Sequence, residues 1–448
     1  MDRLQVCFKL LAELRKINVA IGLMEGCADI VIKRESCISA SGTLRFERHI
    51  PAGRSRYPQP AGNSQRWFVR AQVFAPFCSR CVYVTFACMN AQSTSRKRIA
   101  VIPGDGIGQE VIPQAVKVIQ ASGAAVELTD FDWGADRYLR DGVTVPPDGF
   151  AMLARDFDAI LVGAFGDPRV KTNIHAKEIL LGMRFKMDLY ANVRPVRLLD
   201  AALCPLKGIE PKDIDFVVVR ENTEGVYTDA GGIFKQGTPD EIATQEDINT
   251  RKGVERIIRY AFQHCERDTK LDGSPRNKVL MCDKSNAMTH AGSLWQRVFK
   301  EVSGEYPQIT AQHMYVDALC MQMVRDPRQF DVIVTNNMFG DIITDLAAGL
   351  QGGLGMAASG NIHPGKTSMF EPVHGSAPPI AGKNVANPFG AILTAAMMLA
   401  HLGMTSEAEK IEAAVLEAVR QKKTTQDIGG PLGTIEAGEW VANFVSLA

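Results

Sequence analysis

The sequence predicts an α/β protein whose parallel or mixed sheet is covered by helices on both faces. Short runs of about five apolar, mostly β-branched residues recur along the chain, and stretches with helical spacing of apolar residues separate them. Strands that are apolar throughout, rather than alternating, are typical of sheets buried on both faces. The runs are RIAVI, DAILV, DFVVV, KVLMC and DVIVT.

The first strand of this pattern begins at Arg98. It ends in the glycine-rich turn GDGIG, and the apolar residues of QEVIPQAVKVIQASG follow with helical spacing. Each later run also ends in polar or Gly-rich residues. Ligands of open α/β sheets collect at the carboxyl ends of the strands, so these residues are candidates for a site. They are Asp105, Asp167, Arg220, Glu221, Asn222, Asp283, Lys284 and Asp341.

The composition is that of an ordinary globular protein. The 448 residues permit two or three domains and are 46% hydrophobic and 22% charged. A formal net charge of zero gives no reason to expect nucleic acid or an anionic membrane as a partner. No stretch reaches the roughly 18 uncharged apolar residues of a membrane span.

The first 95 residues differ from the rest. Residues 1–88 hold 13 Lys and Arg but 6 Asp and Glu, and six of the ten cysteines. A presequence and a zinc or redox site at Cys78-Ser-Arg-Cys81 are possible interpretations, but early acids argue against the first and the lone CxxC against the second. We expect residues 1–95 to be a disordered, dispensable extension, and a chain starting at Met89 to keep full activity.

The other four cysteines are scattered, which suits a reduced, intracellular protein and predicts a cytoplasmic location. They are Cys204, Cys265, Cys282 and Cys320.

The glycine turn resembles a dinucleotide fingerprint but lacks its last glycine. GxGxxG requires glycine at position 109, where this chain has Gln109. The spacing therefore argues against a Rossmann-type site, and a tight strand-to-helix turn is the simpler interpretation.

Three aspartates are candidates for metal binding. Asp341 and Asp345 lie four residues apart, so a helix would place both on one face. Asp317 has apolar neighbours in MYVDALCMQMV, where an unpaired acid is costly. Carboxylates without a Cys/His cluster suit Mg²⁺ or Mn²⁺ rather than zinc. A solvated helix face is the alternative, and it explains Asp341 better than Asp345.

Three arginines and two further residues complete the candidate set. Arg184 and Arg194 flank FKMDLYANV, and Arg220 ends an apolar strand. Guanidinium groups match carboxylates bidentately, which favours a small di- or tri-acid as ligand. Tyr227 and Lys284 can act as acid and base if the site shifts their pKa, although Tyr227 also suits a packing role.

Together these motifs resemble the isocitrate/isopropylmalate dehydrogenase family, over about residues 97–445. The motifs are VIPGDGIGQEV, RPVRLL, VVVRENTEGVY, DKSNAM, YVDALCMQMV, NMFGDIITDLAAGL, FEPVHGSAPPIAGKNVANPFGAI and TQDIGG. The resemblance implies that family's two-domain fold, with mixed sheets flanked by helices. Residues 96–190 with 352–448 would bind the dinucleotide, and residues 191–351 the substrate, metal and partner subunit.

The resemblance also implies metal-dependent oxidative decarboxylation of a 2-hydroxy acid by NAD(P)⁺. Arg184, Arg194 and Arg220 would hold the substrate carboxylates. Asp341 and Asp345, with Asp317 from a partner subunit, would hold Mg²⁺ or Mn²⁺, and Asp317 would also lie against the substrate. Lys284 would help to remove the hydroxyl proton and Tyr227 would protonate the enol carbon. A homodimer with shared active sites is therefore expected.

The cofactor loop implied by the resemblance is His374 to Asn387. The expected cofactor residues are Glu371, His374, Gly375, Ser376, Ala377 and Asn387. Pro379 and Ile380 stand where family members carry residues that distinguish NAD from NADP. The missing cationic pair favours NAD weakly and does not exclude NADP.

Leu180 and Leu181 precede Arg184 and favour an alkyl substituent on the substrate. We therefore expect 3-isopropylmalate, converted to 4-methyl-2-oxopentanoate in leucine biosynthesis. D-malate or tartrate, and then isocitrate, are the alternatives. A non-catalytic regulatory subunit is a further one, but such a subunit would be expected to lose part of the acid, base or metal set, which is complete here.

Overall fold

A computed structural model describes residues 30–32, 42–46, 67–74, 82–90 and 96–447 of the chain. The chain divides into two compact units, Met1–Ser95 and Arg96–Ala448, which we describe separately.

The first unit contains a four-stranded antiparallel sheet with the order β1-β4-β3-β2. Its strands are β1 (Ile30–Ile32), β2 (Gly42–Phe46), β3 (Trp67–Phe74) and β4 (Val82–Asn90). The sequence predicts disorder for residues 1–95, but four strands lie within them. For the other residues up to 95, disorder stays a prediction. The CxxC pair, Cys78 and Cys81, lies outside the described residues.

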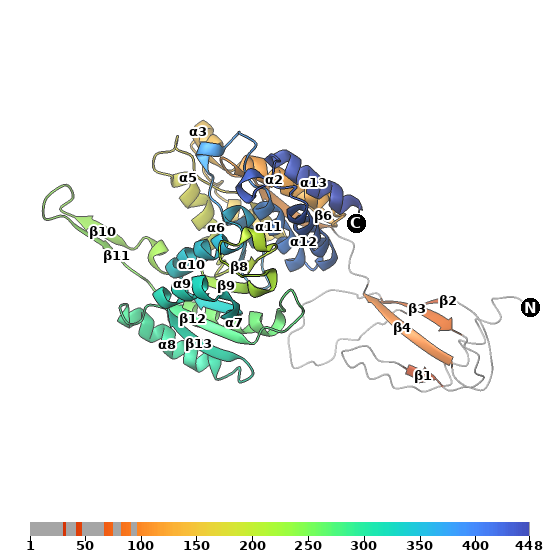
Figure 1. Ribbon diagram of the computed structural model, residues 1–448. Helices are drawn as coiled ribbons and strands as arrows, with labels where there is room; N and C mark the ends of the chain where they lie inside the picture. Colours follow the sequence, from red (N-terminus) through yellow and green to blue (C-terminus); the bar gives the residue numbers. More distant parts are fainter. Residues whose placement is uncertain (1–29, 33–41, 47–66, 75–81, 91–95, 448) are drawn as a thin grey trace, which may run out of the picture. The chain divides into compact units, whose positions relative to one another are not determined.

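The second unit (Figure 1) is built on one ten-stranded mixed sheet. Its strand order is β13-β12-β14-β9-β8-β15-β16-β7-β5-β6. The neighbours in β9-β8-β15-β16 pair antiparallel, and all other neighbours pair parallel. The strands are β5 (Lys97–Ile102), β6 (Val126–Asp130), β7 (Ala159–Val162), β8 (Ala191–Arg197), β9 (Asp215–Glu221), β12 (Lys278–Asp283), β13 (Thr310–Tyr315), β14 (Val332–Thr335), β15 (Ala358–Ile362) and β16 (Ser368–Pro372). The predicted mixed α/β class is confirmed.

Helices cover both faces of this sheet, and the side chains of its strands divide between the two faces. In β5, Ile99 and Val101 join the largest apolar cluster, while Ala100 and Ile102 join another on the opposite face. The same alternation recurs in β9, because successive side chains of a strand point to opposite faces. The fully apolar runs of the sequence are therefore strands buried from both sides.

Helices separate most strands of this unit, and the first of them follows the glycine turn, as the spacing predicts. They are α2 (Gly108–Ala121), α3 (Ala135–Asp141), α4 (Gly149–Asp156), α5 (Ile174–Ala176), a π-helix (Lys177–Leu181), α6 (Gly182–Lys186), α7 (Arg251–Arg267), α8 (Thr289–Ser303), α9 (Val316–Arg325), α10 (Asn337–Leu350), α11 (Phe389–His401), α12 (Thr405–Arg420) and α13 (Thr434–Leu447). Within the described residues, none is long and apolar enough to cross a membrane.

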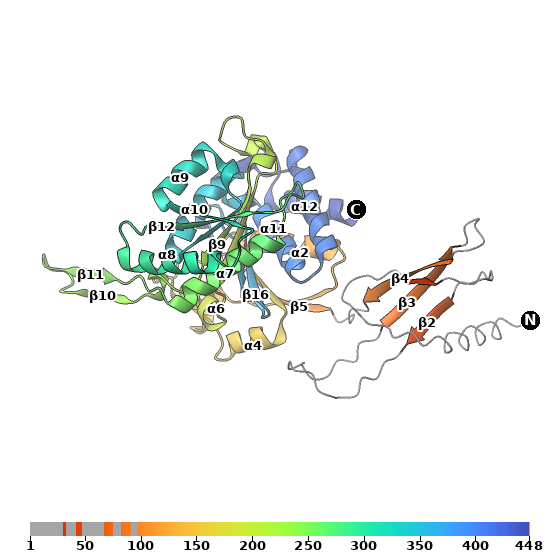
Figure 2. The same cartoon turned by 90° about the horizontal axis from the view of Figure 1, so that it is seen from below.

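A two-stranded antiparallel hairpin extends from the body of the second unit in both views (Figures 1 and 2). It consists of β10 (Gly231–Phe234) and β11 (Ile242–Gln245). Its side chains are exposed, including the apolar Ile233, Phe234 and Ile242. An exposed apolar hairpin is costly in water unless it has a partner.

Candidate active site

Helix α10 brings the two predicted metal ligands to the sheet. Asn336 begins the helix as its N-cap, and its side chain accepts a hydrogen bond from the backbone N–H of Phe339. Gly340 then lets α10 approach β9 closely, because a Cβ there would lie 2.4 Å from Cγ of Arg220. The glycine therefore sets the distance between Arg220 and the next residue of the helix, Asp341.

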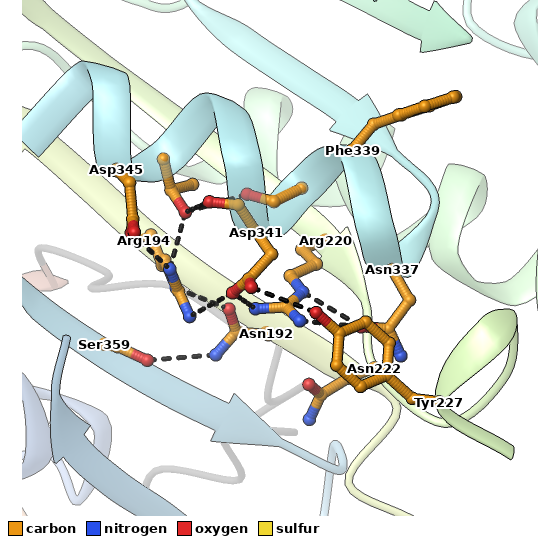
Figure 3. A network of polar contacts seen from close by, with 12 residues as sticks. Asn192, Arg194, Arg220, Asn222, Tyr227, Asn337, Phe339, Asp341, Asp345 and Ser359 are labelled. Atoms are coloured by element: carbon orange, nitrogen blue, oxygen red, sulfur yellow. Dashed lines mark hydrogen bonds and ion pairs between the residues drawn. The ribbon is translucent and has the colours of Figure 1, made fainter. Parts of the chain in front are cut away.

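Asp341 is the centre of a polar network (Figure 3). Its Oδ1 accepts a hydrogen bond of 2.6 Å from Nη1 of Arg220, and its Oδ2 accepts one of 3.0 Å from the Tyr227 hydroxyl. Nη2 of Arg194 lies 3.7 Å from Oδ1 of Asp341. Two predicted substrate residues, the predicted acid and a predicted metal ligand are thus brought together.

Asp345 lies one turn further along α10, on the same side as Asp341 (Figure 3). Its Oδ1 is 3.9 Å from Nη1 of Arg194, beyond hydrogen-bond distance. The Asp345 side chain is 58% exposed and that of Asp341 44% exposed. The helical pair therefore presents two carboxylates to solvent beside a buried arginine, as the spacing predicts.

Burial is the largest single influence on the pKa values of Arg194, Asp341 and Asp345. It lowers the pKa of Arg194 to about 9, with help from the positive charge of Arg220. Burial alone would raise the pKa of Asp341, but Arg220 and Arg194 together hold it below its usual range. Burial raises the pKa of Asp345; Arg194 opposes that rise and Asp341 adds to it. An additional positive charge between the two carboxylates would therefore be stabilised.

The third predicted arginine is held by a carboxylate that was expected to bind cofactor. Nη2 of Arg184 donates a 2.8 Å hydrogen bond to Oε1 of Glu371, and both side chains are buried. Oε1 also accepts a hydrogen bond of 2.9 Å from the Asn361 amide. The structure thus places Glu371 beside Arg184, one of the three arginines predicted to bind substrate.

Leu180 and Leu181 lie in the π-helix that precedes α6, and both are half-buried. Leu180 packs against the apolar cluster beneath α4 and α6. A π-helical turn is rare and is frequently found at functional sites.

Lys284 and Asp317 pair with each other and not with the α10 aspartates. Nζ of Lys284 donates a 2.6 Å hydrogen bond to Oδ1 of Asp317, which lowers the pKa of that carboxyl. The Asp317 side chain is 67% exposed. Within the described residues, no three His, Cys, Asp or Glu side chains form a group able to hold a metal ion. Within the described part of the chain, the pair Asp341 and Asp345 therefore lies apart from the pair Lys284 and Asp317.

The predicted cofactor loop follows β16. His374 is buried, which lowers its pKa, and its Nε2 has no hydrogen-bond partner although it is inaccessible to solvent. Asn387 accepts from the backbone N–H of Phe389 at the start of α11 and donates to Asp427. His374 thus has free hydrogen-bonding capacity, whereas Asn387 already serves the structure. Gly375 is exposed, Ser376 is buried and Ala377 begins a short 3₁₀ helix.

The sequence did not identify the amides that orient the arginines. Asn192 accepts a 2.8 Å hydrogen bond from Nε of Arg194 and donates to Ser359, and Asn337 accepts two bonds from Arg220. The available signal for Asn192 was its place two residues before Arg194, because alternate side chains of a strand lie on one face and a buried amide needs partners.

Comparisons with known proteins identify the family of the chain. Residues 98–441 match the family described as isocitrate/isopropylmalate dehydrogenase. The chain belongs to the isocitrate/isopropylmalate dehydrogenase family. Its relatives include a 3-isopropylmalate dehydrogenase of Thermobifida fusca (strain YX), 47% identical over 78% of this chain and 98% of the relative. One of Corynebacterium efficiens is 48% identical over 78% of this chain and 99% of the relative.

Two solved structures support membership in the same family. The isocitrate dehydrogenase from Methylococcus capsulatus superimposes with a TM-score of 0.70 at 37% identity, over 78% of this chain and 99% of that chain. The TT0538 protein from Thermus thermophilus also gives a TM-score of 0.70, at 38% identity over 80% of this chain and 70% of that chain. Membership in the isocitrate/isopropylmalate dehydrogenase family makes the chain a dehydrogenase, as its motifs predict.

Proposed function

We propose that the protein oxidatively decarboxylates 3-isopropylmalate to 4-methyl-2-oxopentanoate and CO₂, with NAD⁺ as hydride acceptor, in leucine biosynthesis. The observation that carries the proposal is 47–48% identity to 3-isopropylmalate dehydrogenases along nearly their whole length. The complete set of acid, base and arginine side chains supports an active enzyme over a regulatory subunit.

The arginines give the site its preference for a dicarboxylate. Arg194 and Arg220 are buried and converge on Asp341, and Arg184 is buried against Glu371. Buried guanidinium groups with few counter-charges gain most from a ligand that carries two carboxylates. Substrate carboxylates would take up the donor groups of Arg184, Arg194 and Arg220.

The donor set of α10 fits a hard divalent cation. Asp341 and Asp345 offer carboxylate oxygens on one face, and burial first and then the charge of Asp341 raise the pKa of Asp345, effects that a bound cation would oppose. Asp341 and Asp345 would hold Mg²⁺ or Mn²⁺, with Asp317 of a second subunit as further ligand. When bound, the cation would supply charge stabilisation at the oxygen of the reacting carbon.

Tyr227 and Lys284 would move the protons. Burial and the negative charge of Asp341 raise the pKa of Tyr227, so its hydroxyl keeps its proton at neutral pH and can donate it. Lys284 would help to remove the proton of the substrate hydroxyl. The carbon that carries this hydroxyl would transfer a hydride to the nicotinamide. After CO₂ is lost, Tyr227 would protonate the remaining enol carbon.

The identity of the hydroxy acid is tested by initial rates with 3-isopropylmalate, D-malate and isocitrate, each with NAD⁺ and NADP⁺ and Mg²⁺. We expect 3-isopropylmalate with NAD⁺ to give the highest kcat/KM, because Leu180 and Leu181 offer apolar surface, worth about 0.8 kcal/mol per buried methylene. A tenfold advantage of isocitrate would contradict the assignment. No rise in NADH absorbance with any substrate would favour the regulatory subunit.

For the cofactor, we propose NAD bound by the loop His374–Asn387, with Glu371, Gly375, Ser376 and Ala377 at its sides. The buried, unpartnered Nε2 of His374 supports this placement. Pro379 is exposed and offers no side-chain donor to a 2′-phosphate, so the comparison of NAD⁺ with NADP⁺ above is the test.

We propose a homodimer with shared active sites, because several large apolar side chains are exposed on the hairpin and on helices α9 and α10, which contact each other. They are Ile233, Phe234 and Ile242 on the hairpin, Met321 and Val324 on α9, and Ile342 on α10. Association would bury them and would bring Lys284 and Asp317 of one subunit to α10 of the other.

Replacing Phe234 and Ile242 together by serine is expected to yield monomers with strongly reduced activity, because both lose apolar contacts with the partner. Analytical ultracentrifugation measures the mass and initial rates the activity. Ile435→Ser, at an exposed position of α13, is the matched control and should stay dimeric and active. A fully active monomer would contradict the shared site.

We also propose the domain division and the location. The apolar cluster beneath α9 and α10 draws all its residues from 191–351, which supports a substrate domain there; the largest cluster joins it to the proposed dinucleotide domain of 96–190 and 352–448. The four cysteines of residues 96–447 are free, which supports a reducing, cytoplasmic environment.

A further inference from the structure

The glycine turn GDGIG has no role in the reaction described above, yet its aspartate is almost completely buried. Asp105 is 5% exposed and lies at the start of the turn that joins β5 to α2. A buried carboxylate is costly unless hydrogen bonds compensate it. The hydrogen-bond partners of Asp105 therefore indicate the role of the turn.

Asp105 joins three segments that are distant in the sequence. Its Oδ1 accepts a 2.7 Å hydrogen bond from the backbone N–H of Ala135, at the start of α3. Its Oδ2 accepts one of 2.8 Å from the backbone N–H of Gly166, and it lies 2.8 Å from Nε2 of His175. A single carboxylate thus ties together α3, the loop after β7 and the segment that contains α5.

The turn also touches the proposed cofactor loop. The backbone N–H of Ile107 donates a 2.9 Å hydrogen bond to the Ser376 carbonyl oxygen. Gly106 has a φ of +54°, and a Cβ there would lie 2.1 Å from the same oxygen. The turn therefore contacts both the proposed cofactor loop and the segment that contains His175.

His175 stands near the start of the helical stretch 174–186, which carries the proposed substrate residues. It is fully buried, and the ring of Tyr138 stacks on its ring at 6.2 Å. The π-helix and α6 continue directly from it, so Leu180, Leu181 and Arg184 follow without a break. At the other end of the stretch, Arg184 bonds Glu371. The position of His175 therefore fixes one end of the proposed substrate-recognition stretch, and Glu371 the other.

We propose that the buried Asp105–His175 pair is a positioning device that holds the stretch 174–186 in register with the glycine turn and the cofactor loop. His175 is a positioning residue, because it acts through Leu181 and Arg184. The inference rests on the proposed function, since it assigns substrate recognition to that stretch.

His175→Leu keeps the apolar volume but removes the donor to Asp105, whereas His175→Gln restores an amide donor of comparable reach. We expect His175→Leu to raise KM for 3-isopropylmalate by about tenfold while kcat changes less than about threefold, because a displaced Arg184 weakens ground and transition states alike. His175→Gln is expected to recover most of the lost affinity. Initial rates at saturating NAD⁺ measure both constants.

A purely structural role is separated by a matched control. Ile119 lies in the core on α2, so Ile119→Val lowers stability without touching the pair. Hydrogen exchange of residues 174–186 should become faster in His175→Leu and stay at the wild-type rate in Ile119→Val and His175→Gln. This readout needs no activity, so it also separates the inference from the proposed substrate.

The inference is overturned if His175→Leu leaves KM and the exchange of 174–186 unchanged, or if Ile119→Val raises KM as much. Failure of the proposed function has a different signature: the wild-type chain would not turn over 3-isopropylmalate, while the exchange difference between His175→Leu and His175→Gln would persist.

Discussion

Replacing Asp341 by asparagine is expected to lower kcat/KM by about 10²–10³-fold, the loss typical of removing one electrostatic contact to the transition state. Asp341 accepts hydrogen bonds from both Arg220 and Tyr227 and would hold the divalent cation beside Asp345. The neutral amide keeps the size of the side chain but removes the charge that attracts the cation. Initial rates over a range of Mg²⁺ concentrations measure the loss.

The Mg²⁺ series separates a metal ligand from a structural acid. A weakened cation site should show a higher half-saturating Mg²⁺ concentration, and the wild-type enzyme should lose its activity in excess chelator and regain it with Mn²⁺ or Mg²⁺. Asp326→Asn is the control, because Asp326 is an exposed carboxylate at the end of α9 that pairs with Arg328. An Asp341→Asn enzyme with a normal rate and an unchanged Mg²⁺ dependence would contradict the proposed site.

The strands that the sequence predicts are those whose environment is uniform. β5, β7, β9, β12 and β14 are buried on both faces, so their apolar runs are continuous. β8 was missed although it lies at the centre of the sheet, because Arg194, Pro195 and Arg197 interrupt its apolar pattern. Pro195 is tolerated there because β15 pairs with β8 only along Ala191–Val193.

The candidate site also contains local features that the sequence predicts and long-range contacts that it does not. The spacing of Asp341 and Asp345 was sufficient to predict one helical face, since that geometry is local. The contact of Glu371 with Arg184 was not predicted, because it joins elements far apart in the chain. Neither spacing nor composition carries that long-range information. The pairing of Lys284 with Asp317 is a contact between the end of a strand and the start of a helix, and spacing did not predict it either.

Replacing Tyr227 by phenylalanine is expected to lower kcat by about 10²-fold, at the lower end of what a positioned general acid contributes. The Tyr227 hydroxyl bonds Oδ2 of Asp341, and the Arg220 guanidinium lies 5.4 Å from the centre of its ring. Phenylalanine keeps the ring and this packing but removes the proton that the enol carbon would receive. Hydride transfer precedes that step, so a first burst of NADH followed by slow turnover is expected in stopped-flow absorbance.

The pH dependence gives an independent check on Tyr227. Burial and Asp341 raise its pKa above 10, so the phenol keeps its proton at every lower pH, and the rate ratio of wild type to Tyr227→Phe should stay constant between about pH 7 and 9. A ratio that fell as pH rose through this range would mean that the phenol loses its proton there, and would contradict the raised pKa. Tyr306→Phe is the matched control, because Tyr306 is a half-buried tyrosine whose ring stacks on Phe262 of α7. If Tyr227→Phe showed no loss of kcat beyond that of this control, the proton would have to come from another group or from water.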